Sequence, residues 1–124
     1  MRALIVDDSS FARGRLRALL QEQGIECVEA GDGRAAMDIL HGGPRFDLAF
    51  VDWNMPVMDG LEMLQQLRAE PYEELKAIMV TTEGNKRSIL RALNAGADEY
   101  LMKPFDKQGL GDKLALLGIG GTGE

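Results

Sequence analysis

Short apolar runs alternate with stretches of helical spacing along nearly the whole chain. The apolar runs occupy residues 3–6, 26–30, 48–52, 77–81 and 100–102, and the helical stretches occupy residues 10–22, 33–41, 60–69, 86–95 and about 106–117. Strands that alternate with helices of this length predict βαβ units and a five-stranded parallel sheet. Right-handed crossovers then favour a doubly wound (βα)5 fold, which is a three-layer α/β/α sandwich.

Residues at the helix ends support these boundaries. Ser9 and Ser10 are candidate N-caps for the first helix, and Asp106 is a candidate for the last one. Gly24 and Gly96 follow predicted helices, where glycine is typical of a helix C-terminus.

Apolar side chains recur at helical spacing within each predicted helix. The stretch 86–95, for example, carries Ile89, Leu90 and Leu93. We expect these leucine-rich stripes and the seven methionines to form core together with the strands. Cys27 lies inside a short strand and is expected to be a small buried hydrophobe.

Length and charge exclude several classes of protein. At 124 residues the chain is expected to form one domain, and its net charge of −6 argues against nucleic-acid binding by this chain alone. The apolar runs are too short to span a membrane, and the N-terminus lacks a signal-peptide layout. With Cys27 as the only cysteine, no internal disulfide can form, and a cytoplasmic location is expected.

The C-terminal end differs in composition from the rest. Residues 118–124 are rich in glycine, which predicts a frayed tail after a domain at residues 1–117. The start of a linker to a further segment is the alternative interpretation.

Three acidic residues and one lysine stand where predicted strands end. Asp7 and Asp8 follow the first strand, Asp52 ends the third, and Lys103 follows the fifth. Since the carboxyl ends of parallel strands share one edge of the sheet, these side chains can meet there. Clustered carboxylates repel each other unless a cation lies among them, and a hard ion such as Mg2+ prefers oxygen ligands. The pattern therefore predicts a metal-assisted site that receives a phosphoryl group.

The residues around these positions resemble the receiver domain of two-component response regulators, in particular the stand-alone chemotaxis (CheY) type. Four segments carry the resemblance: Asp7-Asp8, Asp52-Trp53-Asn54-Met55-Pro56-Val57-Met58-Asp59-Gly60, Met79-Val80-Thr81-Thr82-Glu83 and Tyr100-Leu101-Met102-Lys103-Pro104-Phe105. The resemblance covers roughly residues 2–117. It implies a flavodoxin-like fold with the strand order 2-1-3-4-5.

The resemblance implies a role for each residue at the edge of the sheet. Asp52 is expected to be the phosphoacceptor, since a carboxylate can attack phosphorus and form an aspartyl phosphate. Asp8, Asp52 and the backbone carbonyl of Asn54 are expected to bind Mg2+ directly, and Asp7 to help hold it, through water. Lys103 is expected to contact a phosphoryl oxygen, and a cis bond is implied between Lys103 and Pro104.

Further positions are assigned by the same resemblance. Thr81 would donate its hydroxyl to the phosphoryl group, and Tyr100 would change rotamer as Thr81 moves. Asn54, Thr82 and Glu83 would tune the hydrolysis of the aspartyl phosphate. Thr82 departs from the usual Ala or Gly, and its extra bulk predicts slower entry of water.

The resemblance also implies a function and partners. The chain would be a signalling protein and not an enzyme, although it would assist its own phosphorylation and dephosphorylation. A sensor histidine kinase would donate the phosphoryl group, with acetyl phosphate as a small-molecule substitute, and a phosphatase is a further possible partner. A monomer is expected, whose target binds the face formed by the helix at 86–95, the strand at 100–102 and the last helix.

Two other functions are also compatible with the resemblance. The chain could be a receiver module of a larger regulator with a C-terminal output domain. It could also be an adaptor or phosphate sink without a switch.

Other families explain fewer of these residues. The segment 31–36 fits a dinucleotide fingerprint, but NAD binding leaves Asp7, Asp8 and Lys103 unexplained. A haloacid-dehalogenase phosphatase needs a general acid where this chain has Asn54. Flavodoxin is disfavoured because Asp7 and Asp8 would repel the FMN phosphate.

Overall fold

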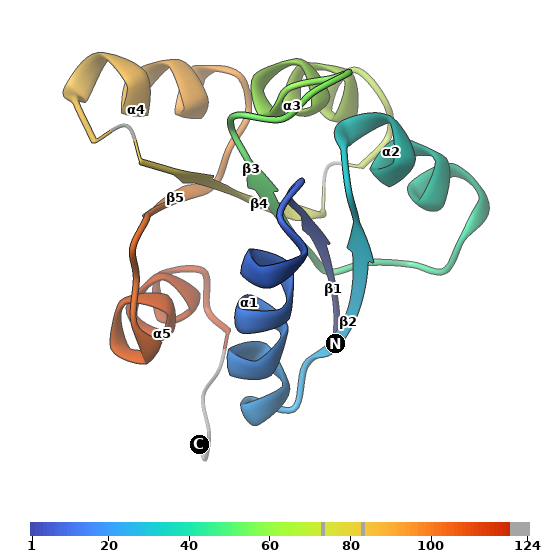
Figure 1. The fold of residues 1–124 in the computed structure, drawn as a ribbon. Helices are drawn as coiled ribbons and strands as arrows, with labels where there is room; N and C mark the ends of the chain where they lie inside the picture. Colours follow the sequence, from blue (N-terminus) through green and yellow to red (C-terminus); the bar gives the residue numbers. More distant parts are fainter. Residues whose placement is uncertain (73, 83, 120–124) are drawn as a thin grey trace.

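A parallel five-stranded sheet forms the centre of the computed structural model, which describes residues 1–72, 74–82 and 84–119 (Figure 1). The strands are β1 (Arg2–Val6), β2 (Glu26–Ala30), β3 (Leu48–Asp52), β4 (Lys76–Thr81) and β5 (Glu99–Met102). The helices are α1 (Ser10–Glu22), α2 (Gly33–Gly42), α3 (Gly60–Arg68), α4 (Lys86–Asn94) and α5 (Lys107–Leu116). The strand order is β2-β1-β3-β4-β5, which confirms the predicted fold class.

Alternating strand residues divide the core into two layers. Leu4 and Val6 of β1 face the side covered by α2, α3 and α4, whereas Ala3 and Ile5 face α1 and α5. This division follows from the two-residue period of side chains in a strand. β3 is buried along its whole length, as expected for a central strand covered on both faces.

The order of the strands reverses between β1 and β3, which pair directly with each other. Val6 lies beside Val51 in this pair, so the residues that follow β1 and the end of β3 are adjacent. Such a reversal leaves a crevice at the carboxyl ends of the two strands, because the following helices go to opposite faces. Asp7 and Asp52 therefore come together as a consequence of the topology.

Polar caps and glycines define the helix ends. Ser9, and not Ser10, caps α1, and its hydroxyl accepts a hydrogen bond from the Ala12 N–H. Asp59 and Glu62 form a capping box at the start of α3. Helices α1, α4 and α5 end in Schellman motifs, in which a glycine with positive φ reverses the chain. These glycines are Gly24, Gly96 and Gly118, with φ of 78°, 116° and 77°.

The Gly118 motif lies beyond the predicted end of the domain at residue 117. The Ile119 N–H donates to the Leu114 carbonyl at 2.8 Å, and the Ile119 side chain packs against the core layer under α1 and α5. Gly118 and Ile119 therefore continue the packed structure. Residues 120–124 of the predicted tail lie outside the described residues.

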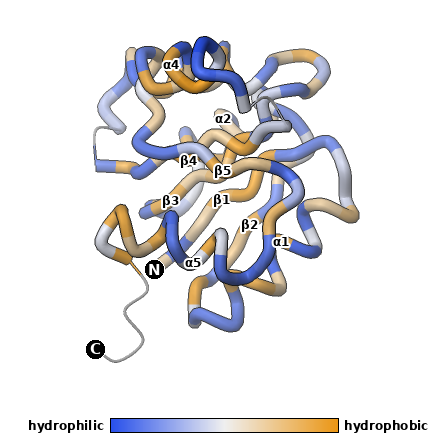
Figure 2. Tube along the Cα trace, turned by 90° about the vertical axis from the view of Figure 1, so that its left-hand side faces the viewer, coloured by the Kyte–Doolittle hydropathy of each residue, from blue (hydrophilic) through white to orange (hydrophobic). Residues whose placement is uncertain are grey.

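The expectation that every leucine stripe is core is wrong for α4. Leu90 is 50% exposed and Leu93 is 39% exposed, and Ala92 is the only buried residue of this helix. The physical reason is position, because α4 packs at the edge of the sheet, next to the last strand (Figures 1 and 2). Met1 is likewise exposed, whereas Cys27 is buried as predicted.

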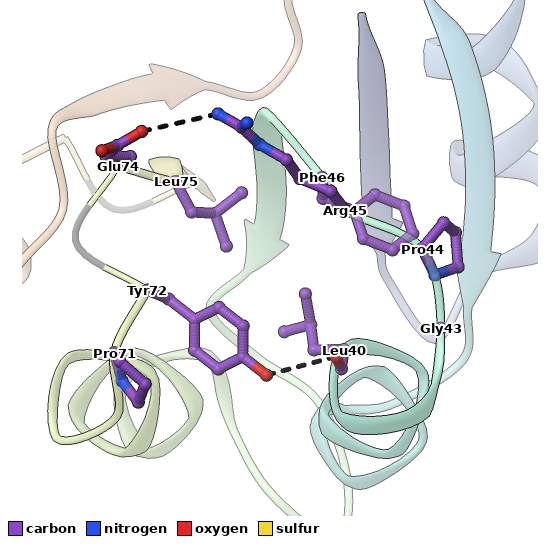
Figure 3. Close-up of a pocket in the computed structure, with 9 residues that line it drawn as sticks. All are labelled: Leu40, Gly43, Pro44, Arg45, Phe46, Pro71, Tyr72, Glu74 and Leu75. Atoms are coloured by element: carbon purple, nitrogen blue, oxygen red, sulfur yellow. Dashed lines mark hydrogen bonds and ion pairs between the residues drawn. The ribbon is translucent and has the colours of Figure 1, made fainter.

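A hollow of about 460 Å³ lies at the amino ends of β3 and β4, opposite the acidic edge. Phe46, Leu75 and Tyr72 contribute to its walls, and the Tyr72 hydroxyl donates to the Leu40 carbonyl at 3.2 Å (Figure 3). None of the residues predicted to form the functional site lines this hollow.

Among the described residues, no helix is long and apolar enough to cross a membrane.

The close approach of α3 to β3 leads to a stability prediction. A Cβ on Gly60 would lie 2.9 Å from the Trp53 Cα and even closer to the Asp52 carbonyl oxygen. We expect Gly60→Ala to lower the free energy of unfolding by about 1–3 kcal/mol, because backbone on both sides must shift. Urea denaturation measures this change.

Gly111→Ala in α5 is the matched control, since a Cβ there has nothing within 4 Å. It should raise the free energy of unfolding by up to about 1 kcal/mol, because alanine favours a helix interior. Equal stability of the two variants would contradict the proposed contact at Gly60.

Candidate functional site

Three carboxylates meet at the carboxyl edge of the sheet. Asp7 and Asp8 follow β1, and Asp52 is the last residue of β3. One oxygen from each of these side chains lies within 4.8 Å of the others. Asp7 and Asp52 are buried and Asp8 is exposed, so the cluster opens to solvent on the side of Asp8.

Lys103 brings a positive charge into this cluster from the end of β5, the outermost strand on that side of the sheet. Its Nζ lies 3.0 Å from Asp7 Oδ2 and 3.3 Å from Asp52 Oδ1. The residue directly follows β5, and its bond to Pro104 is cis, as the resemblance implied. The four strand-end side chains predicted to meet are thus together.

Asp7 is held at each of its polar groups. Its N–H donates to the Ala30 carbonyl at 3.1 Å, and its Oδ1 accepts from the Ser9 N–H at 2.9 Å. Oδ2 accepts from Lys103, and the carbonyl oxygen accepts from the Arg13 guanidinium. Because each of its polar groups has a hydrogen-bond partner, the Asp7 side chain has a fixed orientation. A fixed orientation suits a side chain that must hold a metal ion in one place.

Arg13 is a contributor that the sequence did not reveal. Its Nε donates to Glu29 Oε1 at 3.0 Å, and Arg17 donates to the other oxygen of Glu29 at 2.7 Å. Hydrogen bonding from Arg17 and Arg13 lowers the pKa of Glu29 against the opposing effect of burial. The ionised Glu29 therefore anchors Arg13 beside the Asp7 carbonyl. The spacing of four residues between Arg13 and Arg17 indicates that both lie on one face of the helix. No local sequence pattern, however, linked that face to Asp7.

The electrostatics of Asp52 reflect both its burial and its neighbours. Loss of hydration raises the pKa of Asp52, and the charge of Asp7 raises it further, while Lys103 partly offsets both effects. For Lys103, burial acts to lower the pKa, but the hydrogen bond to Asp7 and the charge of Asp52 outweigh burial and raise it. The lysine is therefore a permanent cation in a site with surplus negative charge.

The donor set fits a hard divalent cation. Asp7, Asp8 and Asp52 offer oxygen donors alone, and three carboxylates against one ammonium leave an excess of negative charge. Mg2+ is bound in proteins through few carboxylates and keeps several of its waters. The exposed side of Asp8 leaves room for such waters.

The remaining predicted residues surround the cluster. Thr81 is buried at the end of β4, and Tyr100 is half-buried in β5. Asn54 is exposed in the loop after β3. Thr82 is exposed and lines a hollow of about 280 Å³ with Asp7 and Lys103. Glu83 lies outside the described residues.

Two aromatic contacts near the site involve side chains that the sequence did not single out. The Arg91 guanidinium of α4 lies 5.8 Å from the centre of the half-buried Trp53 ring. The Lys113 ammonium of α5 lies 3.9 Å from the centre of the Tyr100 ring. These residues are far apart in the chain, so no local sequence signal could have paired them.

Gly33, one of the two glycines of the dinucleotide fingerprint, has another explanation. A Cβ on Gly33 would lie 2.9 Å from the Met58 carbonyl oxygen, because the loop after β3 packs over the start of α2. The small residue is needed for this packing.

Known proteins resemble the chain over almost its full length. The family described as the response regulator receiver domain matches residues 3–115. A chemotaxis protein CheY homolog of Campylobacter jejuni is 44% identical over 123 residues, covering 97% of this chain and 95% of that protein.

Solved structures give the same result. The chemotaxis response regulator CheY4 of Vibrio cholerae has a TM-score of 0.87 at 34% identity, covering 94% of this chain and 97% of its own. The response regulator TrrA of Thermotoga maritima, solved in complex with Mg2+-BeF, has a TM-score of 0.82 at 35% identity with the same coverage. The chain belongs to the response regulator receiver domain family, whose members are phosphoacceptor proteins of two-component signalling.

Proposed function

We propose that Asp52 is the residue that receives the phosphoryl group in this receiver. The main support is its position, buried at the end of β3 with its Oδ1 3.3 Å from the Lys103 ammonium. Asp52 ends its strand at the crevice between β1 and β3, where an incoming phosphoryl group can reach it. Its carboxylate attacks phosphorus and becomes an aspartyl phosphate, while the leaving group departs on the opposite side.

Mg2+ is the cofactor that this donor set fits. We assign its binding to the carboxylates of Asp8 and Asp52 and the backbone carbonyl of Asn54, with Asp7 assisting through water. When bound, the ion supplies positive charge that balances the carboxylates and the phosphoryl oxygens. The fixed orientation of Asp7 and the exposure of Asp8 support this division of roles.

The surrounding residues complete the proposed chemistry. Lys103 provides a point charge for a phosphoryl oxygen, and the Thr81 hydroxyl donates a hydrogen bond to another. In this way the domain assists its own phosphorylation and dephosphorylation. Asn54, Thr82 and Glu83 tune hydrolysis, and the exposed Thr82 beside Lys103 restricts the approach of water.

Phosphorylation of Asp52 would change the surface beside β5, and a target protein would detect this change. Thr81 moves toward the phosphoryl group, Tyr100 changes rotamer, and the face formed by α4, β5 and α5 binds its target differently. The exposed Leu90, Leu93 and Leu116 on this face support a docking role.

The proposed partners follow from the family. A sensor histidine kinase donates the phosphoryl group to a monomeric receiver, and a phosphatase is a further possible partner. The Campylobacter jejuni and Vibrio cholerae relatives named above are chemotaxis proteins, and we extend this type of two-component pathway to the chain. The similarity to CheY proteins does not favour the alternative of a module from a larger regulator.

The first experiment uses Trp53, the only tryptophan, which adjoins Asp52. We expect Mg2+ and then beryllofluoride, a mimic of the phosphoryl group, to change its fluorescence in two saturable steps. Asp52→Asn should abolish the beryllofluoride step, because the attacking oxygen is lost. Asp38→Asn is the matched control, since Asp38 is exposed in α2 away from the cluster.

A Mg2+ step without a beryllofluoride step in the wild type would contradict the phosphoacceptor role. Loss of the beryllofluoride step in both variants would show that the effect of Asp52→Asn is not specific. Folding of each variant is checked by circular dichroism.

The charge of Asp52 leads to a second prediction, about stability in the absence of Mg2+. Because the folded-state pKa of Asp52 is raised, its ionisation penalises the folded state. This penalty is complete above the folded pKa and disappears below the unfolded pKa of about 3.9. Asp52→Asn should therefore be more stable than the wild type at pH 7, by an amount on the order of 1 kcal/mol, and lose this advantage below about pH 4.

Thermal unfolding across this pH range measures the difference, and added Mg2+ should reverse its sign at pH 7. At 100 times its dissociation constant, a ligand stabilises the folded state by about 2.7 kcal/mol, and Asp52→Asn loses most of this gain. An Asp52→Asn variant that is less stable than the wild type at pH 7 without metal would contradict the account.

A further inference from the structure

Tyr100 contacts two charged side chains that have no part in the acid cluster, one at its ring and one at its backbone N–H. The Lys113 ammonium of α5 lies 3.9 Å from the centre of the Tyr100 ring. The same nitrogen lies 3.1 Å from Glu99 Oε1, which also accepts the Tyr100 N–H at 3.0 Å. One carboxylate oxygen thus connects the backbone of Tyr100 to the cation above its ring.

These groups are partly removed from water. The side chains of Lys113 and Glu99 are 22% and 18% exposed, far less than the 67% of Lys107 in the same helix. A cation over an aromatic face is attracted by the electrons of the ring, and partial desolvation strengthens the attraction. Glu99 holds the ammonium in place, so little side-chain freedom is lost when it contacts the ring.

Lys113 contacts the Tyr100 ring on a side away from the direction in which the ring would move in the proposed switch. Tyr100 pairs with Met79 of β4, whereas Thr81 pairs with Met102, so Thr81 lies toward the acid cluster along the strands. Lys113 comes from α5, which lies beside β5 (Figure 1). A ring that turns toward Thr81 leaves Lys113, whose ammonium stays with Glu99. We call the observed arrangement, in which the ring lies against the Lys113 ammonium at 3.9 Å, outward, and this contact is lost when the ring turns toward Thr81.

We propose that Lys113 is a positioning residue of the receiver switch, which holds the Tyr100 ring outward and thereby lowers the affinity of the site for a phosphoryl group. The inference rests on the proposed coupling of Tyr100 to the phosphorylated state. A contact present in only one of two states shifts the equilibrium toward that state. Binding that requires the other state is weakened by the same factor.

The sign of the expected effect separates this role from general electrostatics. Lys113→Gln removes a positive charge, which by itself weakens the binding of any anion. The proposed role predicts the opposite, because release of the Tyr100 ring favours the arrangement that binds beryllofluoride. We expect Lys113→Gln to tighten the apparent affinity for beryllofluoride about fivefold at saturating Mg2+.

The experiment compares wild type, Lys113→Gln, Lys113→Arg and the matched control Lys107→Gln by titration of Trp53 fluorescence. Lys107 carries the same charge in the same helix, but its ion pair is with Glu22 at 2.9 Å. Lys113→Arg keeps a cation over the ring and should restore wild-type affinity. The Mg2+ affinity measured before beryllofluoride should be unchanged in all variants.

Two further measurements assign the effect to the Tyr100 ring. NMR couplings of the Tyr100 side chain in the ligand-free protein should show a smaller outward population in Lys113→Gln than in Lys107→Gln. In a Tyr100→Val background, Lys113→Gln should no longer tighten beryllofluoride binding, because the ring it restrains is absent.

The outcomes distinguish this inference from the proposed function. A wild type that binds no beryllofluoride overturns the proposed function and the claim about affinity with it. A wild type that binds, with Lys113→Gln matching Lys107→Gln in affinity and in Tyr100 population, overturns the role of Lys113 alone. Tighter binding that persists in the Tyr100→Val background also overturns it, since the effect would not pass through the ring.

Discussion

Repulsion among three carboxylates, balanced by one lysine, is the interaction on which the rest of this structure depends. Asp7 and Asp52 are buried within reach of each other, and each contacts the Lys103 ammonium. Burial and like charge raise the pKa of Asp52, so the cluster is stabilised by added positive charge. A site with surplus negative charge and oxygen donors is suited to a divalent cation and, with that cation, to a phosphoryl group.

The fold brings these charges together at the cost of stability, and tight packing maintains the arrangement. The reversal of strand order between β1 and β3 makes Asp7 and Asp52 neighbours, and β5 places Lys103 at the same edge. Gly60 allows α3 to start against the backbone of Asp52. The Arg13 guanidinium donates a hydrogen bond to the Asp7 carbonyl. Each of these contacts fixes an orientation that repulsion would otherwise disturb.

The sequence predicted the features that depend on periodicity and topology. Strand ends meet at one edge whatever the side-chain details, so the cluster of Asp7, Asp8, Asp52 and Lys103 could be anticipated. Contacts that depend on tertiary placement could not. The leucines of α4 repeat at core spacing but lie at the edge of the sheet, and Lys113 reaches Tyr100 across a loop. The assigned roles of Asn54, Thr82 and Glu83 stay predictions, because they concern the rate of a reaction.

The most direct test of the central claim locates the phosphoryl group on the chain. The purified protein is incubated with acetyl phosphate and Mg2+, reduced with borohydride, which attacks acyl phosphates, and mapped by mass spectrometry of its peptides. The account predicts one reduced aspartate, at position 52, and none when Mg2+ is removed by chelation. Reduction at Asp7 or Asp8 in place of Asp52, or no reduction at any aspartate with metal present, would contradict it.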